Sequence, residues 1–114
     1  MKIELLYTPY CPGYAAARQF LFQVLAEENV PAEVEEIPVE TQADAQRLEF
    51  LGTPSIRVEG MDVEGWLPQS HEYSLRCRVY RENGKSNDHP SKELIRAAIR
   101  AARDVKEFSA AGCC

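Results

Sequence analysis

The sequence has no run of about 18 consecutive apolar residues, the minimum for a membrane-spanning helix. Its first residues enter an apolar segment directly, without the basic and then apolar leader typical of a secretory signal. It has neither a G-x-G-x-x-G motif nor a phosphate-binding loop, and its net charge is −5. We therefore expect a cytoplasmic protein that binds no membrane, nucleotide or nucleic acid.

Cysteine is scarce, with four in 114 residues. They are Cys11, Cys77, Cys113 and Cys114. A chain of this length can bury a hydrophobic core without cross-links, so it needs no disulfide framework. Reduced, reactive or metal-binding thiols are therefore the better interpretation. Histidine is scarcer still, and His71 and His89 lack the spacing and the neighbouring carboxylates of a catalytic metal site.

Hydrophobic periodicity predicts one domain of alternating strands and helices over residues 1–106. The expected strands are 2–7, 32–38, 53–58 and 74–81. The expected helices are about 12–28, about 42–50, and from 88 or 91 to about 106. The connection 59–73 is longer than a hairpin needs. The remaining segment, 107–114, has no apolar periodicity, so we expect a flexible tail.

Cys77 lies on one side of the expected strand 74–81, together with Leu75 and Val79. Alternate side chains of a strand point to the same face, so Cys77 is expected to face the core as a small hydrophobic residue. The alternative is a resolving thiol or a metal ligand at the foot of the long connection. The sequence leaves both roles open.

Cys11 follows the first expected strand and precedes the first expected helix, in the motif Thr8-Pro9-Tyr10-Cys11-Pro12-Gly13-Tyr14. The unpaired N–H groups and the dipole of a helix N-terminus favour a thiolate over a thiol. Tyr14 stands where a C-x-x-C motif has its second cysteine, so the motif has an attacking thiol without an adjacent resolving one. The alternative is an ordinary buried thiol in a scaffold.

The element order β-α-β-α-β-β-α resembles the thioredoxin-like superfamily in its short, glutaredoxin-like form. The resemblance rests on Tyr7-Thr8-Pro9-Tyr10-Cys11-Pro12 and on Gly52-Thr53-Pro54-Ser55-Ile56. It implies an α/β fold with a four-stranded mixed sheet flanked by helices on both faces. It also implies that the peptide bond before Pro54 is cis and that Pro54 faces Cys11 across the active site.

The activity that this resemblance implies is thiol–disulfide exchange, in which Cys11 attacks a disulfide of a protein or a small molecule. Glutathione, another external thiol, Cys113 or Cys114 would resolve the mixed disulfide. The backbone of Thr53 is expected to bind an extended substrate or glutathione in a strand-like manner. Further substrate contacts are expected from Tyr10, Pro12, Tyr14 and Pro54.

The C-terminal Gly112-Cys113-Cys114 carries two adjacent cysteines. A disulfide between neighbours is strained, whereas two thiolates suit a soft metal. The pair is similar to the C-terminal cysteines of mercuric reductases, and the chain is loosely similar to small thioredoxin-like proteins of mercury resistance. The alternative function is therefore binding or transfer of Hg(II) or an organomercurial by Cys11, Cys113 and Cys114, with Cys77 as a further candidate. The sequence also leaves open that the C-terminal cysteines have no function. It does not decide whether the protein is an enzyme.

Overall fold

The computed structural model describes residues 1–9, 11–65 and 73–111. Their elements are, in order, β1 (Lys2–Tyr7), α1 (Tyr14–Glu27), β2 (Glu33–Pro38), α2 (Gln42–Arg47), β3 (Ser55–Val58), β4 (Met61–Asp62), β5 (Tyr80–Glu82), β6 (Lys85–Asn87) and α3 (Lys92–Ala111). Within these ranges the protein is an α/β fold with three helices, a four-stranded mixed sheet and a separate two-stranded sheet. No helix among them is long and apolar enough to cross a membrane.

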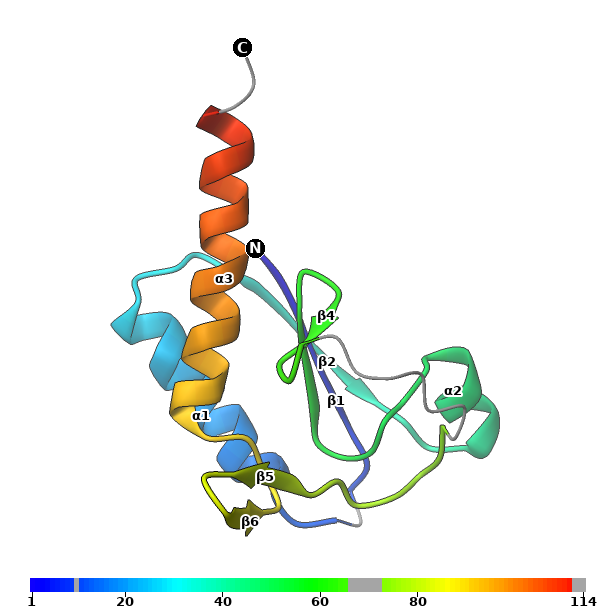
Figure 1. Ribbon diagram of the computed structural model, residues 1–114. Helices are drawn as coiled ribbons and strands as arrows, with labels where there is room; N and C mark the ends of the chain where they lie inside the picture. Colours follow the sequence, from blue (N-terminus) through cyan, green and yellow to red (C-terminus); the bar gives the residue numbers. More distant parts are fainter. Residues whose placement is uncertain (10, 66–72, 112–114) are drawn as a thin grey trace.

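The strand order of the main sheet is β2-β1-β3-β4 (Figure 1). β1 runs parallel to β2 and antiparallel to β3, and β4 is antiparallel to β3. Because β1 and β3 run in opposite directions, the end of β1 lies beside the start of β3, where Leu6 is paired with Ser55. This register brings the turn after β1, which contains Cys11, to the Thr53–Pro54 bond that precedes β3.

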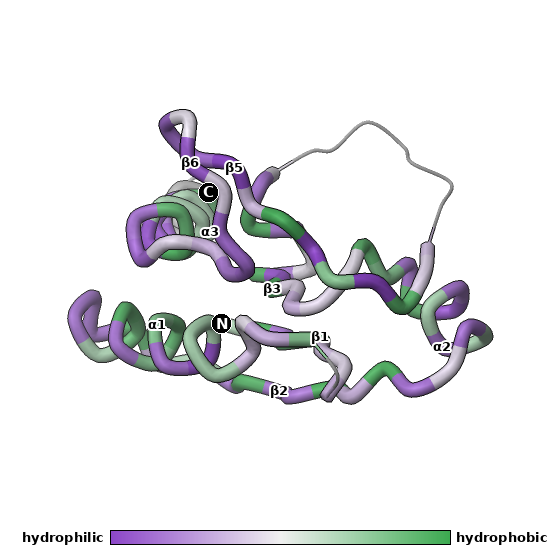
Figure 2. The backbone as a smooth tube through the Cα atoms, turned by 90° about the horizontal axis from the view of Figure 1, so that it is seen from below, coloured by the Kyte–Doolittle hydropathy of each residue, from purple (hydrophilic) through white to green (hydrophobic). Residues whose placement is uncertain are grey.

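The two faces of β1 bury different elements. Ile3 and Leu5 pack into a core formed with α1 and α3, whereas Leu6 packs with residues of and near α2. Both views show α1 and α3 together and α2 well apart from them (Figures 1 and 2). The alternation of strand side chains thus places helices on both faces of the sheet, as expected. The fully buried residues of the main core include Ile3, Leu5, Ala17, Leu21, Val24, Ile56, Tyr80, Ile95 and Ile99.

The prediction that residues 74–81 form the fourth strand of the main sheet is wrong. The fourth strand of the sheet is β4, which pairs with β3 through a hairpin inside the connection 59–73. Glu59 and Gly60 have φ values of 51° and 82°, and a two-residue hairpin turn with positive φ at both positions matches the twist of its strands. Residues 80–82 instead pair with β6 in the second sheet.

The buried face of the segment 75–80 is also the reverse of the expected one. Leu75 and Val79 are 39% and 55% exposed, and Cys77 is exposed as well. The opposite side is buried, with Arg78 only 7% exposed and Tyr80 completely buried. Exposed and buried side chains alternate over residues 77–80, and the polar partners of Arg78 account for the side that faces inward.

The C-terminal helix is longer than expected. α3 continues to Ala111, so residues 107–111 of the expected flexible tail are helical. Residues 112–114, which include Cys113 and Cys114, lie outside the described residues. α3 carries the chain away from the turn between β1 and α1 that contains Cys11 (Figure 1).

Candidate functional site

Cys11 and Cys77 form a disulfide, with their Cα atoms 5.5 Å apart and a sequence separation of 66. Cys11 lies in the turn between β1 and α1, and Cys77 lies in the segment that leads to β5. This segment crosses the end of the main sheet close to that turn (Figure 1). Cys11 is half-buried and Cys77 is exposed, so the expectation that Cys77 faces the core is wrong.

The backbone of Thr53 holds the Cys77 segment beside Cys11. Thr53 N–H donates to the Arg76 carbonyl at 2.8 Å, and the Thr53 carbonyl accepts from Arg78 N–H at 2.9 Å. Thr53 and Cys77 are thus partners in a parallel bridge. The Thr53–Pro54 bond is cis, as the resemblance implies. The backbone expected to bind a substrate is therefore hydrogen-bonded to the chain itself.

The side chain of Thr53 joins this arrangement to β1. Its Oγ1 accepts a hydrogen bond from Thr8 N–H at 2.9 Å, and Thr53 is completely buried. Because Thr8 directly follows β1, this bond ties the start of the Cys11 turn to the residue before Pro54. Pro54 is buried, and its carbonyl accepts a hydrogen bond from the Tyr80 hydroxyl at 2.6 Å. Burial raises the pKa of Tyr80, which therefore remains a neutral donor.

Arg78 anchors the same segment on the β4 side. Its guanidinium donates to both carboxylate oxygens of Asp62, at 2.7 and 2.6 Å, and to Glu64 at 2.5 Å. It also donates to Ser55 Oγ at 3.1 Å and lies 4.4 Å from the centre of the Tyr80 ring. Burial alone would lower the pKa of Arg78, but the hydrogen bond to Asp62 and nearby negative charge raise it above its ordinary value.

Gly52 allows the segment 76–78 to pack closely against the chain just before Thr53. Its φ is +123°, and an added Cβ would lie 2.9 Å from the Cβ of Arg78. Replacing Gly52 by alanine is expected to destabilise the protein by about 3 kcal/mol, from backbone strain and overpacking together. Gly84 is the matched control, because its φ is +76° but an added Cβ would meet nothing within 4 Å.

Urea unfolding of the oxidised protein measures both effects of this comparison. Gly84→Ala is expected to cost only the backbone strain, about 1 kcal/mol. A loss of stability for Gly52→Ala no larger than that for Gly84→Ala would mean that the 76–78 segment does not pack against Gly52.

The start of α1 lies next to Cys11 in sequence, and its first turn adds no negative charge. Gly13 is the N-cap, makes no side-chain capping bond, and the first turn contains no acidic residue. A Cβ on Gly13 would overlap the carbonyl oxygen of Asp88. The helix begins at Tyr14, slightly later than expected. Within the first turn of α1, no carboxylate competes with a Cys11 thiolate for the helix dipole.

Tyr14 points to the sheet. Its ring stacks on Tyr7 at 4.2 Å, and its hydroxyl donates a hydrogen bond to Glu36 on β2. That bond raises the pKa of Tyr14 to about 12, with burial adding to the shift. Among the other expected contact residues, Pro12 is exposed beside Cys11. Tyr10 lies outside the described residues, as do Cys113 and Cys114.

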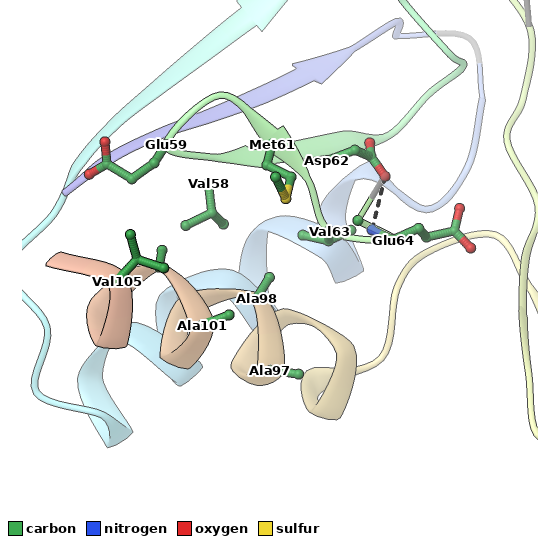
Figure 3. Close-up of a pocket in the computed structure, with 12 residues that line it drawn as sticks. Val58, Glu59, Met61, Asp62, Val63, Glu64, Ala97, Ala98, Ala101 and Val105 are labelled. Carbon is green, nitrogen blue, oxygen red and sulfur yellow. Dashed lines mark hydrogen bonds between the residues drawn. The ribbon is translucent and has the colours of Figure 1, made fainter. Parts of the chain in front are cut away.

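A groove that neither cysteine of the disulfide lines lies between the β3–β4 hairpin and α3. It has a volume of about 520 Å³. Met61 and Val63 border it on the hairpin side, and Ala98 and Ala101 on the α3 side (Figure 3). Its lining is mostly apolar and contains no thiol or imidazole. Among the residues that the structure describes, no three His, Cys, Asp or Glu side chains form a group that could hold a metal ion.

Sequence reasoning found Cys11, Thr53 and Pro54, and the structure brings these residues together. It missed the anchoring role of Arg78, because nothing in the local pattern distinguishes Arg78 from Arg76. Comparisons with protein-family models, curated proteins and solved structures find no match for this chain, so its function is inferred from the geometry of this site.

Proposed function

We propose that this chain is a thioredoxin-like thiol–disulfide exchange protein whose redox pair is Cys11 and Cys77. The observation that carries the proposal is the Cys11–Cys77 disulfide, which joins a half-buried and an exposed cysteine beside a cis proline. The four-stranded mixed sheet, with Cys11 after β1 and Pro54 before β3, agrees with the resemblance. In this proposal the resolving thiol is Cys77, which the sequence left open as an alternative to Cys113 or Cys114.

The reaction of the reduced protein has two exchange steps. The Cys11 thiolate attacks one sulfur of a substrate disulfide, forms a mixed disulfide and releases the first substrate thiolate. The Cys77 thiolate then attacks the Cys11 sulfur, forms the Cys11–Cys77 bond and releases the second thiolate. Two electrons pass from the protein to the substrate. The reverse steps, driven by an external thiol, reduce the protein again.

Two features support Cys11 as the attacking thiol. It lies just before the N-terminus of α1, where the helix dipole favours a thiolate. The first turn of α1 contains no acidic residue that would oppose this charge. Cys77 suits the resolving step, because backbone bonds to Thr53 on both sides hold it next to Cys11. Groups held in such a geometry react much faster than groups that must first meet by diffusion.

The alternative is a purely structural disulfide, and its reduction potential distinguishes the two. Exposed exchange disulfides have potentials of roughly −180 to −270 mV, whereas structural ones lie below about −300 mV. We expect a value in the first range when the Cys113→Ser, Cys114→Ser variant is equilibrated in glutathione buffers and the free thiols are alkylated and counted. A potential below about −300 mV would make the disulfide a structural cross-link.

A further inference from the structure

We infer that the exchange partners are low-molecular-weight thiols and disulfides, not extended polypeptides bound by strand pairing. The reason is that the chain itself occupies the strand position beside Thr53. This inference rests on the proposed function and names the class of its substrate. It departs from the expectation that Thr53 binds the backbone of an extended substrate.

Both backbone hydrogen-bonding groups of Thr53 already have partners within the chain. Thr53 N–H and C=O bond to Arg76 and Arg78, the residues on either side of Cys77. A peptide that added to Thr53 as a strand would need these same two groups. It would therefore have to displace the segment 76–78 before it could pair.

The contacts that hold this segment do not depend on the disulfide. The Arg78 guanidinium is buried and bonded to Asp62, Glu64 and Ser55. Two residues further on, the buried Tyr80 donates to the Pro54 carbonyl. None of these bonds involves sulfur, so all of them remain when the disulfide is reduced. The segment then stays in place, and Cys77 stays beside Cys11.

A small thiol or disulfide needs only access to sulfur. Cys77 is exposed and Cys11 is half-buried, so a low-molecular-weight disulfide can meet the thiols without displacing the chain. Such a disulfide oxidises the Cys11–Cys77 dithiol and leaves as two thiols. Two small thiols reverse the reaction and leave as one disulfide. The protein thereby equilibrates its cysteine pair with the small thiol pool.

The test compares three probes that release the same coloured thiol, 2-nitro-5-thiobenzoate. The first is its mixed disulfide with glutathione. The second is its mixed disulfide with an extended cysteine peptide, and the third is the same peptide with N-methylated amides on both sides of the cysteine. The protein is the full chain with Cys77→Ser, Cys113→Ser and Cys114→Ser, which leaves Cys11 as its single thiol. The same chain with Cys11→Ser as well is the control.

We expect the glutathione probe to react at Cys11 at least as fast as the peptide, and N-methylation to change the peptide rate by less than about twofold. A peptide advantage of about tenfold that N-methylation removes would overturn the inference and leave the proposed function standing. If no probe reacts faster than with the Cys11→Ser control, the proposed function fails, and the inference fails with it.

Amide hydrogen exchange measured by NMR tests the same inference without any substrate. The amides of Thr53 and Arg78 are expected to keep their protection within about tenfold when the wild-type disulfide is reduced. Loss of protection at both amides on reduction, with the core amides of β1 unchanged, would show that the segment leaves and would overturn the inference.

Discussion

Replacing Cys77 by serine is expected to trap Cys11 in a mixed disulfide with its substrate. Release of the second substrate thiol should slow by about 100-fold or more at millimolar external thiol, because a positioned intramolecular thiol is lost. The change is nearly isosteric and leaves the backbone bonds of residue 77's neighbours to Thr53 intact. Single-turnover kinetics and intact-mass spectrometry measure the adduct and its lifetime.

The matched variant is Cys11→Ser, which removes the attacking thiol instead. It should form no adduct at residue 11 and lose the exchange that depends on the Cys11 thiolate, while its fold is kept by the same hydrogen bonds. A Cys77→Ser protein that releases both thiols at the wild-type rate would contradict the account. If replacing Cys113 and Cys114 then slowed release, the C-terminal pair would be the resolving one.

Replacing Arg78 by methionine is expected to destabilise the protein by about 3–5 kcal/mol, because it leaves the nearly buried carboxylate of Asp62 without its cation. The side chains of Asp62 and Glu64 are 8% and 28% exposed, so water screens Asp62 least. Methionine keeps much of the length of the arginine stem, which limits the contribution of a cavity. Urea unfolding of the oxidised protein gives the change in the free energy of unfolding.

Arg81→Met is the control for Arg78→Met, since Arg81 is an exposed arginine on β5 and is expected to change stability by less than about 0.5 kcal/mol. The double variant Arg78→Met, Asp62→Leu should recover part of the loss, because apolar residues can replace a buried ion pair. Equal stability of the Arg78→Met and Arg81→Met proteins would show that the ion pairs do not anchor the segment.

Much of the fold could be predicted from the sequence because its elements follow the periodicity of one buried face. β1 runs from Lys2 to Tyr7 as expected, and Ala17, Leu21, Val24 and Leu25 of α1 are buried at helical spacing. These elements pack against a continuous hydrophobic core, so their apolar residues recur with the period of a strand or of a helix. The pairing of β1 with β3 also brought Cys11 and Thr53 together.

The segment around Cys77 could not be predicted in this way. Its local pattern of Leu75, Cys77 and Val79 indicates a buried apolar face, yet the opposite face is buried. Arg78 faces inward to bond Asp62 and Glu64, which lie 16 and 14 residues earlier in the sequence, beyond the reach of a local strand pattern. A local strand pattern predicts that side chains alternate between two faces, but it does not identify the ion-pair partner of a buried charged residue.

For the same reason, the sequence offered Cys77 as a resolving thiol only as an alternative to a core-facing residue. Cys11 and Cys77 are 66 residues apart in sequence, and their meeting depends on the β3–β4 hairpin, on the bonds to Thr53 and on the inward side of Arg78. Cys113 and Cys114 were expected to resolve Cys11 because two adjacent cysteines stand out in the sequence. The contact between Cys77 and Cys11 cannot be recognised from the sequence.

Peptide mapping by mass spectrometry, without reduction, tests the central claim most directly. The reduced full-length protein is oxidised with one equivalent of glutathione disulfide, its remaining thiols are blocked, and it is digested. The account predicts a Cys11–Cys77 linked peptide as the main product, with Cys113 and Cys114 recovered as blocked thiols. A peptide that links Cys11 to Cys113 or Cys114, with Cys77 blocked, would contradict it.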